Sequence, residues 1–348
     1  MKNIITFLCL FMPQNAIAFA RWGSASDVKL RATVNGEENL TTLDVLSLES
    51  IRSTLIRQEE TVIFALIERA QYRQNRIVYE REGYGSSLGK PPGYQSDGKD
   101  DEELSFLDFM LIGTEILHCG ARRFTSPEEH PFFPEKLPSG PMDALPSLQY
   151  PNDLLSPVGG ANEVNFNKKL LQKYTEIIVP SICKGGDDEQ HGSTTLCDIA
   201  ALQALSRRVH YGKFVAESKY RSNPDAYQKL VDAGDAEGVM KLLTNAVVEE
   251  QVLRRARLKA ATYGTEPMLT DLPKIQCSDM ASIVAAAAAS AVVAAMEALD
   301  NEHLAKGKVD PVAIESVYRD IIIPLTKDIE VAYLFRRCGK EPPAEYLP

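Results

Sequence analysis

The chain has 348 residues, of which 44% are hydrophobic and 25% are charged, and both fractions are ordinary for a globular protein. Its net charge is −10 and it contains no run of basic residues, which argues against nucleic acid as a partner. An anionic ligand would therefore need a local cationic site in an otherwise acidic protein.

Residues 1–18 have the composition of a secretory signal peptide. Lys2 gives the positive start, residues 4–12 form an apolar core too short to span a membrane, and Ala16-Ile17-Ala18 is a small-residue cleavage motif. Residues 19–43 are poor in acids, as transit peptides are, and we expect them to be disordered. Together they resemble the two-part leader of proteins sent to plastids that are bounded by extra membranes. Secretion and a cytoplasmic location are the alternatives.

The cysteines and histidines form no recognisable metal or disulfide pattern. Of the six cysteines, Cys9 lies in the leader and the others are widely scattered, with no CxxC or Cys/His ligand spacing. We therefore predict no metal site. An odd number of scattered cysteines also argues against an oxidising compartment.

Hydrophobic periodicity predicts helices throughout the first half of the mature chain. The predicted helices span residues 46–82, 104–123 and 164–183. Ser47 is the expected N-cap of the first helix. Residues 84–102 form a predicted loop, and residues 126–160 hold many prolines and form an extended connection.

The second half is predicted to be helical as well. Gly192-Ser193-Thr194 opens a helix that contains residues 206–219, and another begins at Asn223-Pro224-Asp225. Asp235 caps a helix that runs to Tyr263. Asp310-Pro311 starts the last helix, which runs to Arg337 and contains Pro324, where we expect a kink or a break.

Residues 264–308 separate the last two helices. They begin with a predicted loop and hold an Ala-rich helix from Met280 to Met296, which is too short and too weakly hydrophobic for a membrane span. No convincing period-two strand pattern occurs anywhere. The sequence therefore predicts an all-α fold, a multi-helix bundle with a single catalytic domain and no membrane partner.

The helical segment 206–219 carries two cations on one face. The residues of this stripe are spaced by 4, 3 and 4 positions, and they are Arg208, Gly212, Val215 and Lys219. The stripe rises by roughly 16 Å. Gly212 lacks a side chain and so lets another group approach the backbone, whereas Arg207 and Lys213 are interpreted as solvent residues. A solvated charged face is the alternative interpretation of the stripe.

Other helices carry polar residues that could complete a site. Asn245 and Glu249 form one i, i+4 pair, Thr326 and Glu330 form another, and Arg52 lies in the first helix. Uncompensated polar groups among apolar residues are costly, although each pair alone is more often a surface pair. The whole set suits a small dianion that bears a hydroxyl and an ether.

Together with further motifs along the chain, these residues resemble the eukaryotic chorismate mutases of fungi and plants, the all-helical (AroQ) class. The resemblance covers about residues 44–340, the predicted mutase domain, in which residues 264–308 exceed the usual loop of the family. It rests on an ordered series of motifs, which are Ile51-Arg52, Arg122 to Glu128, Pro131 to Pro134, Ser206 to Lys219, Thr244 to Glu250, Ile323 to Lys327 and Arg336-Arg337.

The resemblance implies an isomerase that rearranges chorismate to prephenate in phenylalanine and tyrosine biosynthesis, without a cofactor. By this resemblance, Arg52 and Arg208 would clamp the substrate carboxylates. Lys219 and protonated Glu330 would bind the breaking ether oxygen. Asn245 and Glu249 would hold the ring hydroxyl, and Thr326 would line the pocket.

Members of this family are dimers that aromatic amino acids regulate at a site between the subunits. The matching effector-binding positions are Arg122, Arg123, Gly192 and Ser193. Tryptophan is the expected effector. Leu196 stands where the fungal branch has a threonine that helps to bind effector, which weakens the expectation for tyrosine.

Two alternative functions belong to other classes. One is a secreted mutase that acts outside the cell, and the other is a non-catalytic helical binding module that keeps the fold. The intact set of seven pocket residues argues against the second.

Overall fold

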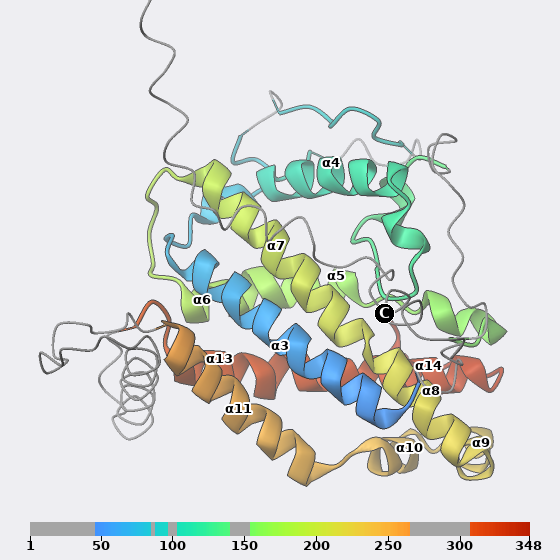
Figure 1. Ribbon diagram of the computed structural model, residues 1–348. Helices are drawn as coiled ribbons and strands as arrows, with labels where there is room; N and C mark the ends of the chain where they lie inside the picture. Colours follow the sequence, from blue (N-terminus) through green and yellow to red (C-terminus); the bar gives the residue numbers. More distant parts are fainter. Residues whose placement is uncertain (1–45, 85–87, 97–102, 140–153, 265–306) are drawn as a thin grey trace, which may run out of the picture. The chain divides into compact units, whose positions relative to one another are not determined.

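The computed structural model describes residues 46–84, 88–96, 103–139, 154–264 and 307–348 (Figure 1). Residues Leu46–Pro348 form one compact unit. Its described residues form helices and connections but no β-strand, which confirms the all-α prediction. None of the helices in these ranges has the length and apolar character that crossing a membrane requires. The predicted leader and the Ala-rich helix lie outside the described residues.

The helices α3 (Leu48–Ala70) and α7 (His191–His210) pack side by side (Figure 1). The predicted N-cap of α3 is confirmed, because the side chain of Ser47 accepts a hydrogen bond from the backbone N–H of Ser50 at 3.2 Å. After α7 the chain turns at Tyr211 and continues as α8 (Gly212–Ser222). The predicted helix 206–219 is therefore two helices, and its cationic stripe crosses their junction.

The first helix ends twelve residues before its predicted end, at Ala70 instead of residue 82. The guanidinium of Arg69, at the end of α3, donates to Asp198 of α7 at 2.5 Å and also to the carbonyl of Arg73 at 2.9 Å. Asn75 then adopts a left-handed conformation, with φ of 48°, and precedes the short helix η3 (Arg76–Tyr79). A buried tertiary ion pair thus ends α3 where the local sequence favours continuation.

The helix α4 (Phe106–Gly120) anchors the proline-rich connection that follows it. Glu115 is buried in α4 and accepts hydrogen bonds from the backbone N–H groups of Phe132 at 2.6 Å and Phe133 at 3.1 Å. The short helix η5 (Arg123–Thr125) comes just before this connection, and the described part of the connection holds η6 (Pro134–Lys136) and η7 (Val158–Glu163). It therefore has more structure than the extended segment predicted there.

Two helices pass through a π-helical turn just before a proline. The consecutive pieces are α5 (Asn167–Lys173), η8 (Tyr174–Ile178) and α6 (Val179–Ile182), and α13 (Pro311–Val317), η10 (Tyr318–Ile322) and α14 (Ile323–Arg337). Pro180 and Pro324 lack the N–H that an α-helical ladder needs, and the wider turn accommodates this loss. The distortion predicted at Pro324 is therefore a π-turn, after which the helix continues to Arg337.

Two short helices, α9 (Pro224–Asp232) and α10 (Ala236–Leu243), lead from α8 to the longer α11 (Ala246–Gly264). The cap at Asp235 is confirmed, since its carboxylate accepts from the N–H of Gly238 at 2.8 Å. The single helix predicted from Asp235 to Tyr263 is wrong, because Thr244 is extended and Asn245 caps a new helix.

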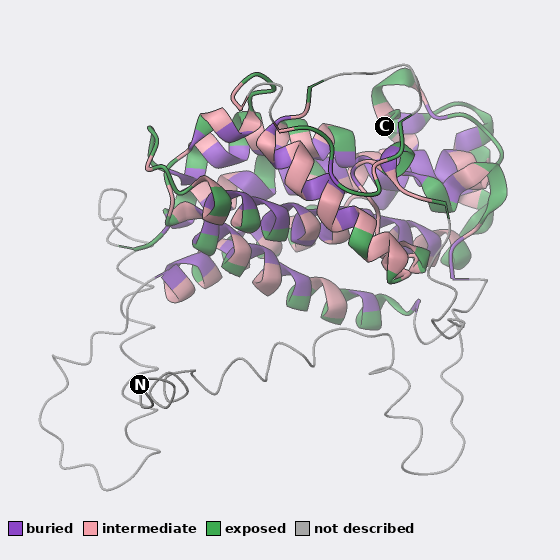
Figure 2. Ribbon diagram, turned by 90° about the horizontal axis from the view of Figure 1, so that it is seen from above, coloured by how far each residue is buried: buried purple, intermediate pink, exposed green. Residues whose placement is uncertain are grey.

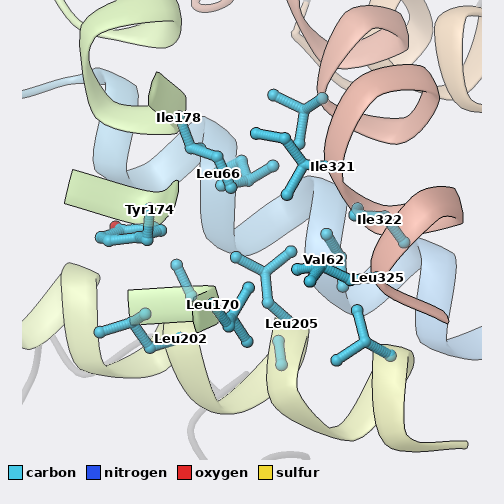
Figure 3. Close-up of a cluster of buried hydrophobic side chains, with 14 of the residues drawn as sticks. Val62, Leu66, Leu170, Tyr174, Ile178, Leu202, Leu205, Ile321, Ile322 and Leu325 are labelled. Atoms are coloured by element: carbon cyan, nitrogen blue, oxygen red, sulfur yellow. The ribbon is translucent and has the colours of Figure 1, made fainter. Parts of the chain in front are cut away.

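Apolar side chains from four parts of the chain meet in the centre of the bundle (Figure 3). Figure 2 shows the buried residues along the inward-facing sides of the helices. Val62 and Leu66 of α3, Leu202 and Leu205 of α7, Leu170 of α5, and Ile321 and Leu325 of the last helix all belong to this core. The core holds α3, α7 and α14 together, and these helices and their neighbours carry the polar residues of the candidate site.

Candidate active site

Arg208 lies in the last turn of α7 with its guanidinium inside the protein. The residue is only 5% exposed, and its Nε and Nη1 atoms are buried without an acceptor among the described residues. A buried donor that lacks its partner costs about 1–3 kcal/mol. A protein bears this cost when a bound anionic ligand supplies the missing acceptor. The solvated-face alternative is therefore wrong for Arg208.

Gly212, the first residue of α8, lets that helix touch α14. A Cβ built on Gly212 would stand 2.9 Å from Thr326 Cγ2, 3.0 Å from the Thr326 carbonyl oxygen and 3.2 Å from Glu330 Cγ. Such distances leave almost no room for a side chain. The expectation that Gly212 admits a close neighbour is confirmed, and the neighbour is α14.

Glu330 projects from α14 into a charged environment, although it is only 7% exposed. Burial raises the pKa of Glu330 to about 7. Lys219 and Arg208 act against this rise, so both cations of the predicted stripe lie near the Glu330 carboxyl. Near neutral pH this carboxyl is therefore poised to hold a proton, and the protonated form can donate a hydrogen bond.

Asn245 and Glu249 lie at the beginning of α11. Asn245 precedes the helix, and its side-chain oxygen accepts a hydrogen bond from the N–H of Val248 at 3.2 Å, so Asn245 is a cap and not a helical residue as predicted. Glu249 lies in the first turn and forms an ion pair with Lys327 of α14, at 2.8 Å to Oε1 and 2.9 Å to Oε2. This pair fastens the start of α11 to α14.

Lys327 is a charged neighbour of the site that the sequence analysis missed as a site residue. It follows Thr326 and precedes Glu330 by three positions, a spacing that places Lys327 and Glu330 on neighbouring parts of the α14 surface. That spacing was the available signal.

The remaining predicted residues have different surroundings. The amine of Lys219 donates to the carbonyl of Leu243, at the end of α10. The hydroxyl of Thr326 donates to the carbonyl of Ile322 at 2.6 Å. Arg52 is exposed near the start of α3 and forms no hydrogen bond or ion pair with the residues that the structure describes. The structure thus groups Arg208, Lys219, Glu249 and Glu330, with no direct contact to Arg52.

Lys213 does not face solvent, contrary to the prediction. It is completely buried, and its amine contacts the carbonyls of Asn162 at 2.7 Å and Val164 at 3.2 Å and Nε2 of His130 at 2.5 Å. Burial lowers the pKa of Lys213 to about 7. The local sequence cannot show this burial, because the surrounding groups come from the connection between α4 and α5.

The four predicted effector residues fall into two groups. Arg122 and Arg123 follow α4, and Arg123 donates to Glu129 at 2.8 Å and to Gln203 of α7 at 3.0 Å. Gly192 and Ser193 lie in the first turn of α7, eleven positions before Gln203. Eleven helical residues rise by roughly 16 Å, so one chain does not bring the two groups together.

Acidic, cysteine and histidine side chains form no group of three or more that could hold a metal ion within the described ranges. The site residues above are instead ammonium, guanidinium, amide, hydroxyl and carboxyl groups. Such a set can bind carboxylates and donate hydrogen bonds to an oxygen that gains negative charge.

No protein-family model matches the chain. The chain is 37% identical over 308 residues to "Chorismate mutase 1, chloroplastic" of Arabidopsis thaliana, which covers 88% of this chain and 79% of the relative. A solved chorismate mutase from Candida albicans in complex with L-Trp is 34% identical, with a TM-score of 0.66 over 88% of this chain and 98% of the other. AtCM1 with tyrosine bound in the allosteric site is 36% identical, with a TM-score of 0.63 over 87% and 98%.

These similarities extend over most of both chains and join a shared sequence to a shared helical fold. The chain belongs to the chorismate mutase family.

Proposed function

We propose that the protein catalyses the pericyclic rearrangement of chorismate to prephenate. The observation that supports this best is the meeting of the buried Arg208, Lys219 and the raised-pKa Glu330 at the contact of α7, α8 and α14. The reaction needs no nucleophile. It needs a substrate held in its folded, reactive shape and donors aimed at the ether oxygen, where charge builds up as the bond breaks.

Each residue has a role that its chemistry suits. Arg208 binds a substrate carboxylate with its planar donors, and Arg52 is the proposed partner for the second carboxylate once substrate is present. Lys219 and protonated Glu330 donate to the ether oxygen. The residues that hold the ring hydroxyl and line the site are Asn245, Glu249 and Thr326.

A direct assay tests this function. Protein that begins after Ala18 is incubated with chorismate, and prephenate is measured against an Arg208→Ala control. We expect the parent to form prephenate much faster than the control. If the folded parent forms none, the non-catalytic binding module becomes the better explanation.

We further propose that the protein is a homodimer whose effector site contains residues of both subunits. Arg123 contacts Gln203 of α7, far along that helix from Gly192 in its first turn. This separation supports the proposal, because a single amino acid could contact both groups only if they came from different chains. The Candida albicans relative binds L-Trp, and AtCM1 binds tyrosine in its allosteric site. Gly192 and Ser193, at a helix start, suit the carboxylate of such an effector.

The effector is identified by measuring the rate of a confirmed dimer against each amino acid. We expect activation by tryptophan and a weaker response to tyrosine, because Leu196, which is 62% exposed one turn after Gly192, offers no hydroxyl. A dimer whose rate responds to neither amino acid contradicts the assignment of these four residues.

For location, we propose a plastid. The leader-like composition of residues 1–43 and relatives named as chloroplastic support it. A fluorescent fusion of residues 1–45 should enter the plastid. Accumulation in secretory compartments or in the medium would favour the secreted alternative.

A further inference from the structure

Lys327 is a partly buried cation beside the candidate site that has no role in the rearrangement as described above. Its amine contacts both carboxylate oxygens of Glu249, at 2.8 and 2.9 Å. The two side chains are 24% and 29% exposed, so water screens their attraction only in part. Contact with both oxygens fixes where the Glu249 carboxylate lies.

The ion pair belongs to a larger attachment of residues 243–249 to the rest of the bundle. Lys219 of α8 donates to the carbonyl of Leu243, while Lys327 of α14 holds Glu249. Asn245 lies between these two attachments and caps α11. The segment that carries the proposed ring-hydroxyl ligands is therefore held by one lysine at each end.

Lys327 also contributes to the electrostatic environment of Glu330. The charged or titratable groups that face Glu330 are Arg208 of α7, Lys219 of α8, Tyr227 of α9, Glu249 of α11 and Lys327 of α14 itself. Burial is the largest influence and raises the pKa of Glu330 to about 7. Beyond burial, Lys327 lowers this pKa and Glu249 raises it, so the paired charges oppose each other at Glu330.

We propose that Lys327 is a positioning residue that holds Glu249 toward the ring hydroxyl of chorismate and offsets the charge of Glu249 beside Glu330. The inference rests on the proposed function. Loss of Lys327 removes the anchor of Glu249, which weakens substrate binding. It also removes a cation from the surroundings of Glu330, so the carboxyl keeps its proton to a higher pH.

The test is Lys327→Met in the full chain, with KM, kcat and the pH dependence of kcat/KM measured with chorismate. We expect KM to rise roughly tenfold while kcat near pH 6 changes much less. The alkaline fall of kcat/KM should move upward by about half a pH unit or more. Lys327→Arg keeps a cation that can contact both oxygens and should restore both properties.

The next residue of α11, Glu250, forms an ion pair that serves as a matched control. Arg254 pairs with Glu250 at 2.8 Å on the exposed side of the helix, so Arg254→Met removes an ion pair of the same length away from Glu330. It should alter neither KM nor the pH profile. In the Lys327→Met background, Glu249→Gln should add little further rise in KM, because the two residues act together.

If the parent is active but Lys327→Met leaves KM unchanged, the role of Lys327 alone is overturned. The same holds if the pH at which kcat/KM falls stays the same or decreases. A parent that converts no chorismate overturns the proposed function instead. If Lys327→Met does not fold, Lys327→Gln provides the same comparison, since it also removes the charge.

Discussion

The backbone of Gly212 lies directly against Glu330, so closely that a Cβ at position 212 would stand 3.2 Å from Glu330 Cγ. This contact brings α8 and α14 together and sets where the proposed proton donor lies relative to the Arg208–Lys219 stripe. A glycine at this position therefore permits the contact of the two helices and also positions Glu330.

Replacing Gly212 should lower both stability and activity. In Gly212→Ala, alanine improves helix propensity by about 1 kcal/mol. The methyl group, however, would meet the Thr326 carbonyl oxygen at 3.0 Å, and overpacking of this kind costs about 1–3 kcal/mol. We expect a net loss of stability on denaturant unfolding and a lower kcat/KM. Gly185→Ala, where a Cβ meets nothing within 4 Å, is the control and should affect neither. Equal behaviour of the two variants would contradict the prediction.

Arg208 should be sensitive even to a change that keeps its charge. Arg208→Lys retains a cation but loses the planar pair of donors, so kcat/KM should fall substantially. Arg208→Ala should lose more, on the order of 3 kcal/mol or above in transition-state stabilisation. The neighbouring Arg207 is 35% exposed and contacts Glu129, so Arg207→Ala is the matched control and should retain most activity. A folded Arg208→Ala protein with near-normal kcat/KM would remove Arg208 from the site.

The pH profile should depend on Glu330. Burial raises the pKa of Glu330 to about 7, and the protonated form is the proposed donor, so kcat/KM of the parent should fall as pH rises through about 7. Glutamine keeps a donor at every pH and does not titrate. We therefore expect Glu330→Gln to be active and to lack the alkaline fall. If its profile falls as the parent's does, the titrating group lies elsewhere.

Lys213 should make stability depend on pH above neutrality. Burial lowers its pKa from 10.5 to about 7 in the folded protein. Between these values the unfolded chain binds the proton and the folded chain does not, so stability rises with pH across this window, and the full penalty of burying the charge remains below about 7. Urea unfolding of the parent and of Lys213→Met at pH 7, 8 and 9 measures this effect. The parent should gain stability relative to the variant as pH rises, and a constant difference would contradict the prediction.

Much of the fold could be predicted from local sequence. The caps at Ser47, Asp235 and Asp310 lie where the sequence indicated them, because each cap depends on a hydrogen bond to an N–H two or three residues away. Helical periodicity likewise identified most of the helices, and the spacing of Arg208 and Gly212 placed them toward one side of the α7–α8 segment.

The sequence by itself determined where most of the helical segments lie, which polar groups are available and which family the motifs resemble, since all of these depend on short-range spacing. Tertiary structure alone decided that α3 ends at the Arg69–Asp198 ion pair, whose partners are 129 positions apart, and that Lys213 is buried. It also decided that Lys327 meets Glu249. Burial and pairing depend on the removal of water by distant segments, and no local sequence pattern shows which distant segments will pack against a given residue.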